Sequence, residues 1–186
     1  MNYYRDQVTT KSWELLQQLA KKYQFILIGG WAVWLYTHQL KSKDIDLLVK
    51  FDTLEKLRYD FPLTKNERLK KYEIARDEVQ IDVYVPHYSQ LGPDIDRTVI
   101  VDGFTVPPPE TLIALKLTAY RARQGSGKGH KDLIDIISLL LLPSLDWSQI
   151  PTGVISLFNS QTSVPELNLN PHQFSRLKKL WLQKLC

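Results

Sequence analysis

The sequence predicts an α+β protein, with a mixed core to about residue 106 and a helical region over 107–186. Short apolar runs and alternating patterns dominate the first part, and a helical hydrophobic period replaces them beyond Val106. Three consecutive prolines, Pro107 to Pro109, separate the two parts. With 186 residues, 44% of them apolar, the chain can bury one good core with a small second layer. Two fully independent domains are therefore not expected.

The first part opens with a predicted helix from Thr10, because apolar side chains recur on one helical face. These side chains are Trp13, Leu16, Leu19, Ala20 and Tyr23. Residues 25–28 then form a short apolar run that ends in Gly29-Gly30, as a buried strand before a tight turn does. A short helix is expected over 31–38, a strand over 45–49 and another helix over 53–59.

Residues 78–85 alternate cleanly, with valine or isoleucine at every second position, which predicts a half-buried strand whose polar face carries Asp82. Residues 98–106 read as a hairpin, because Asp102-Gly103 supplies the turn between two β-branched runs. The basic patches at 65–71, 121–131 and 176–184 are interpreted as solvated helix faces and loops.

The second part is expected to be helical. Pro109-Glu110 opens a helix toward Arg123, and another helix runs over 131–142. The glycine-rich segment 125–129 between them is interpreted as a flexible connection. A last helix is expected from Asn170-Pro171, a good N-cap and first-turn pair.

Asp44 and Asp46 are the strongest local signal for chemistry. Side chains two positions apart on a strand share a face, so both carboxylates can reach one point. Paired carboxylates repel each other unless a cation lies between them, and magnesium, which prefers oxygen ligands, is the usual solution. An Asp-x-Asp by itself is more often a solvent-facing pair, so other features must support it.

Two features support a phosphate and metal site. Gly29 and Gly30 lie between a predicted strand and a predicted helix, and their lack of side chains lets an anion approach the backbone closely. The N-terminal amides of the helix would then point at that anion. Asp82, on a separate strand, offers a third carboxylate that would complete a two-metal site. A phosphate-cradling turn, a carboxylate pair and a third carboxylate, in this order, are the parts that nucleotidyl transfer needs.

The segments Ile28-Gly29-Gly30-Trp31, Asp44-Ile45-Asp46 and Gln80-Ile81-Asp82 together resemble the pattern of the nucleotidyltransferase superfamily with a polymerase-beta-like core. The resemblance spans about residues 24 to 86. It implies the nucleotidyltransferase fold, a mixed sheet flanked by helices, over 1–106, with the helical region 107–186 packed on that core. The family often carries Arg-x-Thr before its aspartates, whereas this chain has Lys41 and Ser42 in the nearest register.

The helical part is similar to one branch of the superfamily. Lys116 in its helix, followed by Lys131-Asp132 and Asp135 in the next, resembles the AbiEii-type toxin nucleotidyltransferases of toxin–antitoxin and phage-defence systems. The Gly-Gly-Trp-Ala segment also resembles the aminoglycoside and lincosamide nucleotidyltransferases.

The resemblance implies a role for each residue of the site. Gly29, Gly30 and Ser42 would hold the triphosphate of an NTP such as ATP. Asp44, Asp46 and Asp82 would bind two magnesium ions, and Asp82 would also help to deprotonate the attacking hydroxyl. Lys116, counted with the three aspartates as catalytic, and Lys131 would neutralise phosphate charge, and Asp132 would orient Lys116 or a substrate hydroxyl. Surface exposure for Lys116, and helix capping or pairing for Asp132, are the structural alternatives.

We therefore expect a magnesium-dependent nucleotidyltransferase that moves a nucleoside monophosphate onto a hydroxyl of RNA, including tRNA, or of a protein, with a cognate antitoxin as a further partner. The alternatives are a small-molecule, aminoglycoside-like nucleotidyltransferase and a non-catalytic antitoxin-like nucleotide-binding module. The net charge of +4 favours a polyanionic substrate. The single cysteine, Cys186, excludes an intrachain disulfide, and no apolar run is long enough to cross a membrane, so a cytoplasmic protein is expected.

Overall fold

The computed structural model describes residues 2–154 and 157. The chain divides into two compact units, Met1–Pro108 and Pro109–Cys186, which are described separately. The helix expected from Asn170-Pro171 lies outside the described residues.

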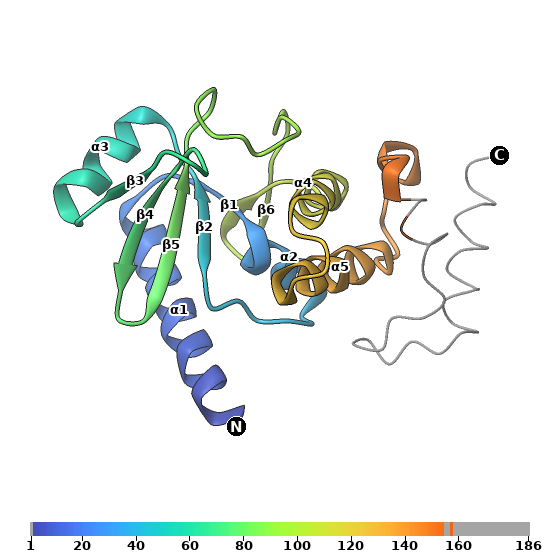
Figure 1. Ribbon diagram of the computed structural model, residues 1–186, viewed down its shortest axis with the longest axis horizontal. Helices are drawn as coiled ribbons and strands as arrows, with labels where there is room; N and C mark the ends of the chain where they lie inside the picture. The colour runs from blue at the N-terminus through green and yellow to red at the C-terminus, as the bar shows by residue number, and fades with distance from the viewer. Residues whose placement is uncertain (1, 155–156, 158–186) are drawn as a thin grey trace. The chain divides into compact units, whose positions relative to one another are not determined.

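A five-stranded mixed sheet forms the centre of the first unit (Figure 1). Its strands lie in the order β1-β2-β5-β4-β3. Their bounds are β1 Ile26–Ile28, β2 Ile45–Leu48, β3 Thr64–Asn66, β4 Lys71–Arg76 and β5 Val79–Tyr84. β2 and β5 are parallel, and the other neighbours are antiparallel. The expected α+β class with a mixed sheet and flanking helices is confirmed.

Three helices accompany this sheet: α1 Asn2–Lys22, α2 Gly29–Thr37 and α3 Phe51–Asp60. Their order and type follow the sequence prediction, but α1 begins eight residues before the expected Thr10. The reason is that Val8 and Thr9 are both buried, so the helix continues toward the N-terminus. In Figure 1, α1 runs behind β4 and β5, and α3 lies beside the β3 edge.

The alternating strand over residues 79–85 buries the side predicted from its sequence. Its valines and the isoleucine are at most 1% exposed, whereas Gln80, Asp82 and Tyr84 are half-buried on the opposite face. The predicted hairpin is present as β6 Val99–Val101 and β7 Phe104–Val106. Asp102 and Gly103 both have positive φ, the conformation that a two-residue hairpin turn requires.

A cluster of aromatic rings joins α1, α2 and β7. Trp13 lies with its ring centroid 4.9 Å from Trp31, 5.1 Å from Trp34 and 5.5 Å from Phe104. The buried indole N–H of Trp31 donates a hydrogen bond to Ser12 Oγ at 2.9 Å. This contact holds the first turn of α2, which contains the glycine pair, against α1.

The interpretation of the 65–71 patch as a solvated surface is wrong for its last residue. These residues enter the antiparallel hairpin of β3 and β4 at the edge of the sheet, and Lys71 is only 8% exposed. The sequence pattern does not identify β4, because most of its side chains are charged and only Tyr72 and Ile74 form an apolar face.

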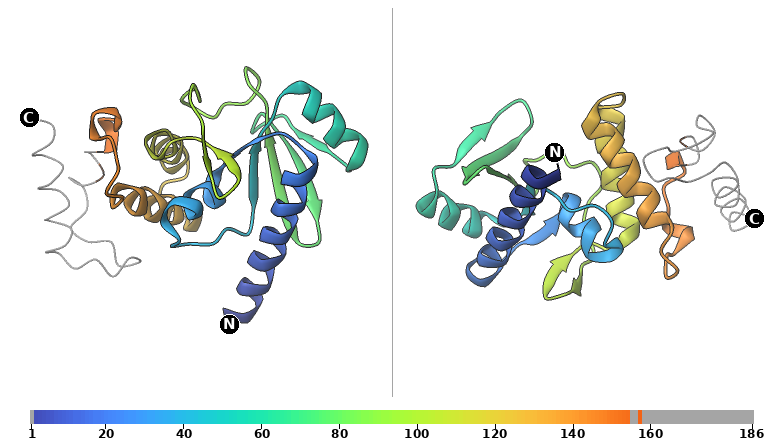
Figure 2. Two further views of the ribbon diagram at one scale, coloured as in Figure 1. Left: turned by 180° about the vertical axis from the view of Figure 1, so that it is seen from behind. Right: turned by 90° about the horizontal axis from the view of Figure 1, so that it is seen from below.

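The second unit contains α4 Pro109–Ala122, α5 Gly127–Leu140 and the short 3-10 helix η1 Trp147–Gln149 (Figure 2). The interpretation of 125–129 as a flexible connection is wrong for its second half, because Gly127 to Gly129 form the first turn of α5. Ser126 caps this helix by accepting a hydrogen bond from the Gly129 N–H at 3.0 Å. A Cβ at Gly129 would collide with the carbonyl oxygen of Arg123, which explains the glycine.

No helix in residues 2–154 is long and apolar enough to cross a membrane.

Candidate active site

Asp46 and Asp82 occupy neighbouring positions on the central pair of strands. They are register partners in the parallel pairing of β2 with β5, so their side chains lie on the same face of the sheet. Adjacent strands are about 4.8 Å apart, which brings the two carboxylates side by side. The structure therefore brings together two acidic residues that are 36 positions apart in the chain.

Gly29 lies directly against Asp46. Ile28, the residue before it, is the register partner of Asp46 across β1 and β2. Gly29 has φ +69°, and a Cβ added there would overlap the carboxylate of Asp46. The glycine is therefore required both by its backbone conformation and by the space that Asp46 occupies.

The N-terminus of α2 opens at the same place. Ile28 occupies its N-cap position and supplies no side-chain hydrogen bond. The first amides of a helix carry partial positive charge and are suited to an anion. Gly29 and Gly30 thus place helix amides beside the carboxylate of Asp46.

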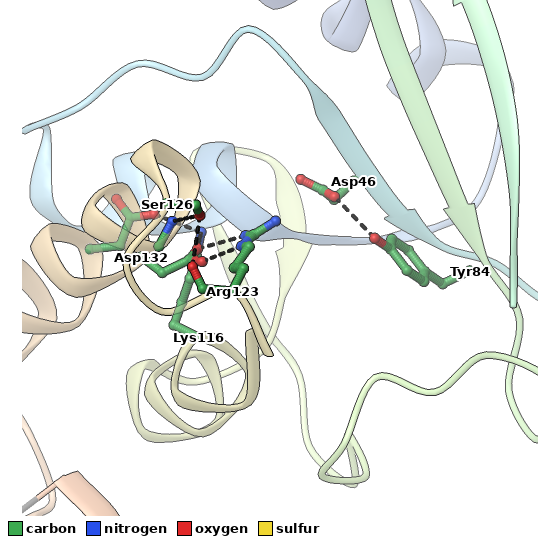
Figure 3. A network of polar contacts seen from close by, with 8 residues as sticks. Asp46, Tyr84, Lys116, Arg123, Ser126 and Asp132 are labelled. Carbon is green, nitrogen blue, oxygen red and sulfur yellow. Dashed lines mark hydrogen bonds and ion pairs between the residues drawn. The ribbon is translucent and has the colours of Figure 1, made fainter. Parts of the chain in front are cut away.

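Asp44 and Ser42 lie in the segment that enters β2. Asp44 precedes the strand and is half-buried, like Asp46, and Ser42 is buried at 3% exposure. The hydroxyl of Tyr84 on β5 lies 3.5 Å from Asp46 Oδ1, a long hydrogen bond (Figure 3). The polar face of the sheet thus continues from Asp46 to the end of β5.

Lys71 is a site residue that the sequence analysis did not identify. Its ammonium nitrogen lies 2.5 Å from Asp82 Oδ2 and 3.0 Å from Glu73 Oε1. Gln80 donates a hydrogen bond to the other oxygen of Asp82 at 3.1 Å. Glu73 is the register partner of Asp82 across β4 and β5. The sequence signal for this cluster is the brief alternation of Lys71 and Glu73 with apolar residues.

The pKa of Lys71 is raised above its usual value. Burial alone would lower this pKa, but the hydrogen bonds to Asp82 and Glu73, with the attraction of both carboxylates, outweigh burial. Lys71 is therefore a cation at neutral pH.

The donor atoms around Asp46 match a magnesium site only in part. Within residues 2–154 and 157, no group of three or more histidine, cysteine, aspartate or glutamate side chains forms a metal cage by itself. Magnesium, however, is usually held by one or two carboxylates together with water and substrate phosphate oxygens. Asp44 and Asp46, with helix amides for the phosphates next to them, fit such a partial ligand set. Asp82 fits it less well, because both of its oxygens already contact donors of the protein.

Lys116, Asp132 and Asp135 meet in the second unit, between α4 and α5. The Lys116 ammonium lies 3.2 Å from Asp132 Oδ1 and 2.6 Å from Asp135 Oδ2. Arg123 binds Asp132 with two hydrogen bonds, at 2.6 and 2.9 Å (Figure 3). Both aspartates are 1% exposed and Lys116 is 8% exposed. Lys116, Asp132 and Asp135 are buried and the Arg123 side chain is 41% exposed, and together the four side chains link α4 to α5.

This network bears on the predicted roles of the helical part. The contact between Asp132 and Lys116 is consistent with an orienting role for Asp132, and the burial of Lys116 excludes a simple surface lysine. Lys131 is half-buried in the first half of α5. Both the binding of phosphates near Gly29 and the action of these second-unit residues on them stay predictions.

The fold is shared with solved structures of low sequence identity. JHP933 from Helicobacter pylori is 15% identical with a TM-score of 0.56, and the match covers 95% of this chain and 93% of that one. Another solved structure, described as that of a putative nucleotidyltransferase from H. pylori, is 15% identical with a TM-score of 0.50, and the match covers 90% of this chain and 89% of that one. The Megavirus polyadenylate synthase is 15% identical with a TM-score of 0.52, covering 85% of this chain and 36% of that one.

No protein-family model and no curated protein matches the sequence. The structural matches show that the chain has the nucleotidyltransferase fold, as expected from its motifs.

Proposed function

We propose that this protein is a magnesium-dependent nucleotidyltransferase that transfers a nucleoside monophosphate from an NTP to a hydroxyl group. The observation that carries this proposal is the position of Asp46, which contacts the glycine at the start of α2 and lies in register with Asp82. Helix N-terminal amides, which would bind the phosphates, therefore lie beside one of two carboxylates on adjacent strands. The shared fold supports the same class of reaction.

Each residue of the site has a chemical task in this proposal. The amides at Gly29 and Gly30, with the Ser42 hydroxyl, bind the triphosphate. Asp44 and Asp46 hold magnesium, which when bound neutralises phosphate charge and polarises the phosphoryl oxygens. Asp82 accepts the hydrogen bond, and then the proton, of the attacking hydroxyl.

The reaction exchanges one bond for another at the α-phosphorus. The acceptor oxygen forms a bond to this phosphorus while the bond to the pyrophosphate oxygen breaks. The proton of the acceptor goes to Asp82, and pyrophosphate leaves with the electron pair of the broken bond.

For the acceptor we propose RNA, with the end of a tRNA as the first candidate and a protein hydroxyl as the second. The net charge of +4 supports a polyanionic acceptor over a cationic small molecule. The resemblance of the Lys116 and Asp132 pattern to toxin nucleotidyltransferases supports a role in a toxin–antitoxin or defence system. In that case, expression of the protein should arrest growth, and Asp44→Ala should relieve the arrest.

A transfer assay tests the proposal. The protein is incubated with magnesium, each labelled NTP in turn, and total RNA or cell extract. We expect label to enter one class of acceptor, and we expect Asp44→Ala or chelation of magnesium to abolish the transfer. Asp96→Ala removes the same charge from an exposed loop of the same unit and should retain activity. The proposal is wrong if no acceptor is labelled and nucleotide binding is the same with Asp44→Ala.

A further inference from the structure

Three acidic residues lie in one row across the sheet. Asp46, Asp82 and Glu73 are successive register partners on β2, β5 and β4, so their side chains share a face. With strands about 4.8 Å apart, neighbouring carboxylates repel unless positive charge lies close to them. A cation beside the row therefore reduces the repulsion among these acids.

The structure contains such a cation in Lys71. Its side chain is 10% exposed, and its ammonium bridges Asp82 at 2.5 Å and Glu73 at 3.0 Å. Asn66 donates a hydrogen bond to Glu73 Oε1 at 3.0 Å, so the far end of the bridge is also held. The chain of contacts runs from β3 through β4 to Asp82 on β5.

The contacts leave little freedom to Asp82. Lys71 binds Oδ2, and the Gln80 amide binds Oδ1. A metal ion that coordinates Asp82 must displace or repel an ammonium that sits in a largely buried position.

We infer that Lys71 is a positioning residue that holds Asp82 where a second metal ion would otherwise stand, so that the site takes its metal at Asp44 and Asp46. This inference rests on the proposed function, and it narrows the expectation of two magnesium ions to one. Lys71 and Gln80 fix the orientation of the Asp82 carboxylate, so that it can accept the hydrogen bond of the attacking hydroxyl. The Lys71 ammonium supplies positive charge beside Asp82 and, unlike a metal ion, cannot leave the site.

The test measures metal binding directly. Mn²⁺ is titrated into the purified protein, without nucleotide and then with a non-hydrolysable NTP analogue, and free Mn²⁺ is followed by electron paramagnetic resonance. The variants are Asp44→Asn, Asp82→Asn, Lys71→Met, Lys71→Arg and the double variant with Lys71→Met and Asp82→Asn. Lys65→Met is the matched control, because Lys65 pairs with Glu67 on the exposed part of the same hairpin.

We expect one Mn²⁺ site that Asp44→Asn removes and Asp82→Asn leaves unchanged. Lys71→Met should tighten Mn²⁺ binding by about tenfold or add a second ion, because a cation within bonding distance of the carboxylate is gone. The double variant should lose this gain, Lys71→Arg should behave like the wild type, and Lys65→Met should change nothing.

The inference is overturned if Asp82→Asn weakens Mn²⁺ binding in the presence of Lys71, or if Lys71→Met binds Mn²⁺ like the wild type. If Lys71→Met does not fold, Asp82→Asn decides alone, because Lys71 keeps Glu73 as a partner in that variant. Failure of the proposed function looks different, since the protein would then show the expected Mn²⁺ pattern but label no acceptor. Label transfer together with a metal site that needs Asp82 would overturn the inference only.

Discussion

Replacing Lys116 with methionine should destabilise the helical unit. Lys116 lies between two aspartates that are each 1% exposed, and its ammonium is 2.6 Å from Asp135 Oδ2. Without it, Asp132 keeps the two hydrogen bonds from Arg123. Asp135 Oδ2 accepts no hydrogen bond from the described residues, so its charge would remain buried without compensation.

The expected cost follows from this burial. Removing one partner of a buried ion pair costs about 3–5 kcal/mol. In a chain of this size each kcal/mol lowers Tm by about 2–4 °C, so Lys116→Met should lower it by about 10 °C. Thermal and urea denaturation followed by circular dichroism measure the change.

Two further variants identify the cause. Adding Asp135→Asn to Lys116→Met removes the uncompensated charge and should restore most of the lost stability. Lys11→Met breaks an exposed pair with Glu78, in which both side chains are about half exposed, and should change the free energy of unfolding by less than about 1 kcal/mol. A Lys116→Met protein as stable as the wild type that no longer binds NTP would refute this reasoning and assign Lys116 to the phosphates.

Three more variants test the local structure. Gly29→Ala should abolish nucleotide transfer, because the new Cβ displaces Asp46. Gly103 also has positive φ, but no atom lies within 4 Å of an added Cβ, so Gly103→Ala should retain the transfer activity. Equal activities of the two variants would contradict this reasoning. Ser126→Ala removes the N-cap of α5 and should cost about 1 kcal/mol in thermal denaturation; an unchanged Tm would show that the cap is dispensable. Hydrogen bonds from Lys22 and Tyr23 lower the pKa of Asp60. The contribution of Asp60 to stability is therefore fully present above its unfolded pKa of about 3.9, and it is lost as the pH falls through the lower pKa of the folded protein. Asp60→Asn should therefore flatten the fall of Tm with pH in this acid range, and an unaltered profile would exclude Asp60 as its cause.

Much of the fold follows from local patterns. The alternation over residues 79–85 identifies β5 and its buried side, because a strand turns successive side chains to opposite faces. Asp102-Gly103 identifies the hairpin, because few other dipeptides adopt two positive φ values without cost. The motif around Asp44 and Asp46 pointed to the fold that the structural matches show.

Other features were beyond these patterns. The hairpin of β3 and β4 carries mostly charged side chains, so its apolar period is too short to identify it, and pairing with β5 makes it a strand. The start of α5 at Gly127 depends on the Ser126 cap and on the close approach of Gly129 to Arg123. Low helix propensity was overridden there by these contacts.

The sequence by itself determined the helices of the first unit, the strands that carry Asp46 and Asp82, and the acidic residues of the site, because these depend on spacing along the chain. Only the tertiary structure decided which acidic residues are neighbours and which basic side chain contacts them. The parallel pairing of β2 with β5 puts Asp46 beside Asp82, and the next pairing brings Lys71 to Asp82. The physical reason is that the pairing of strands far apart in the chain, which no local pattern specifies, sets the distances over which these charges act.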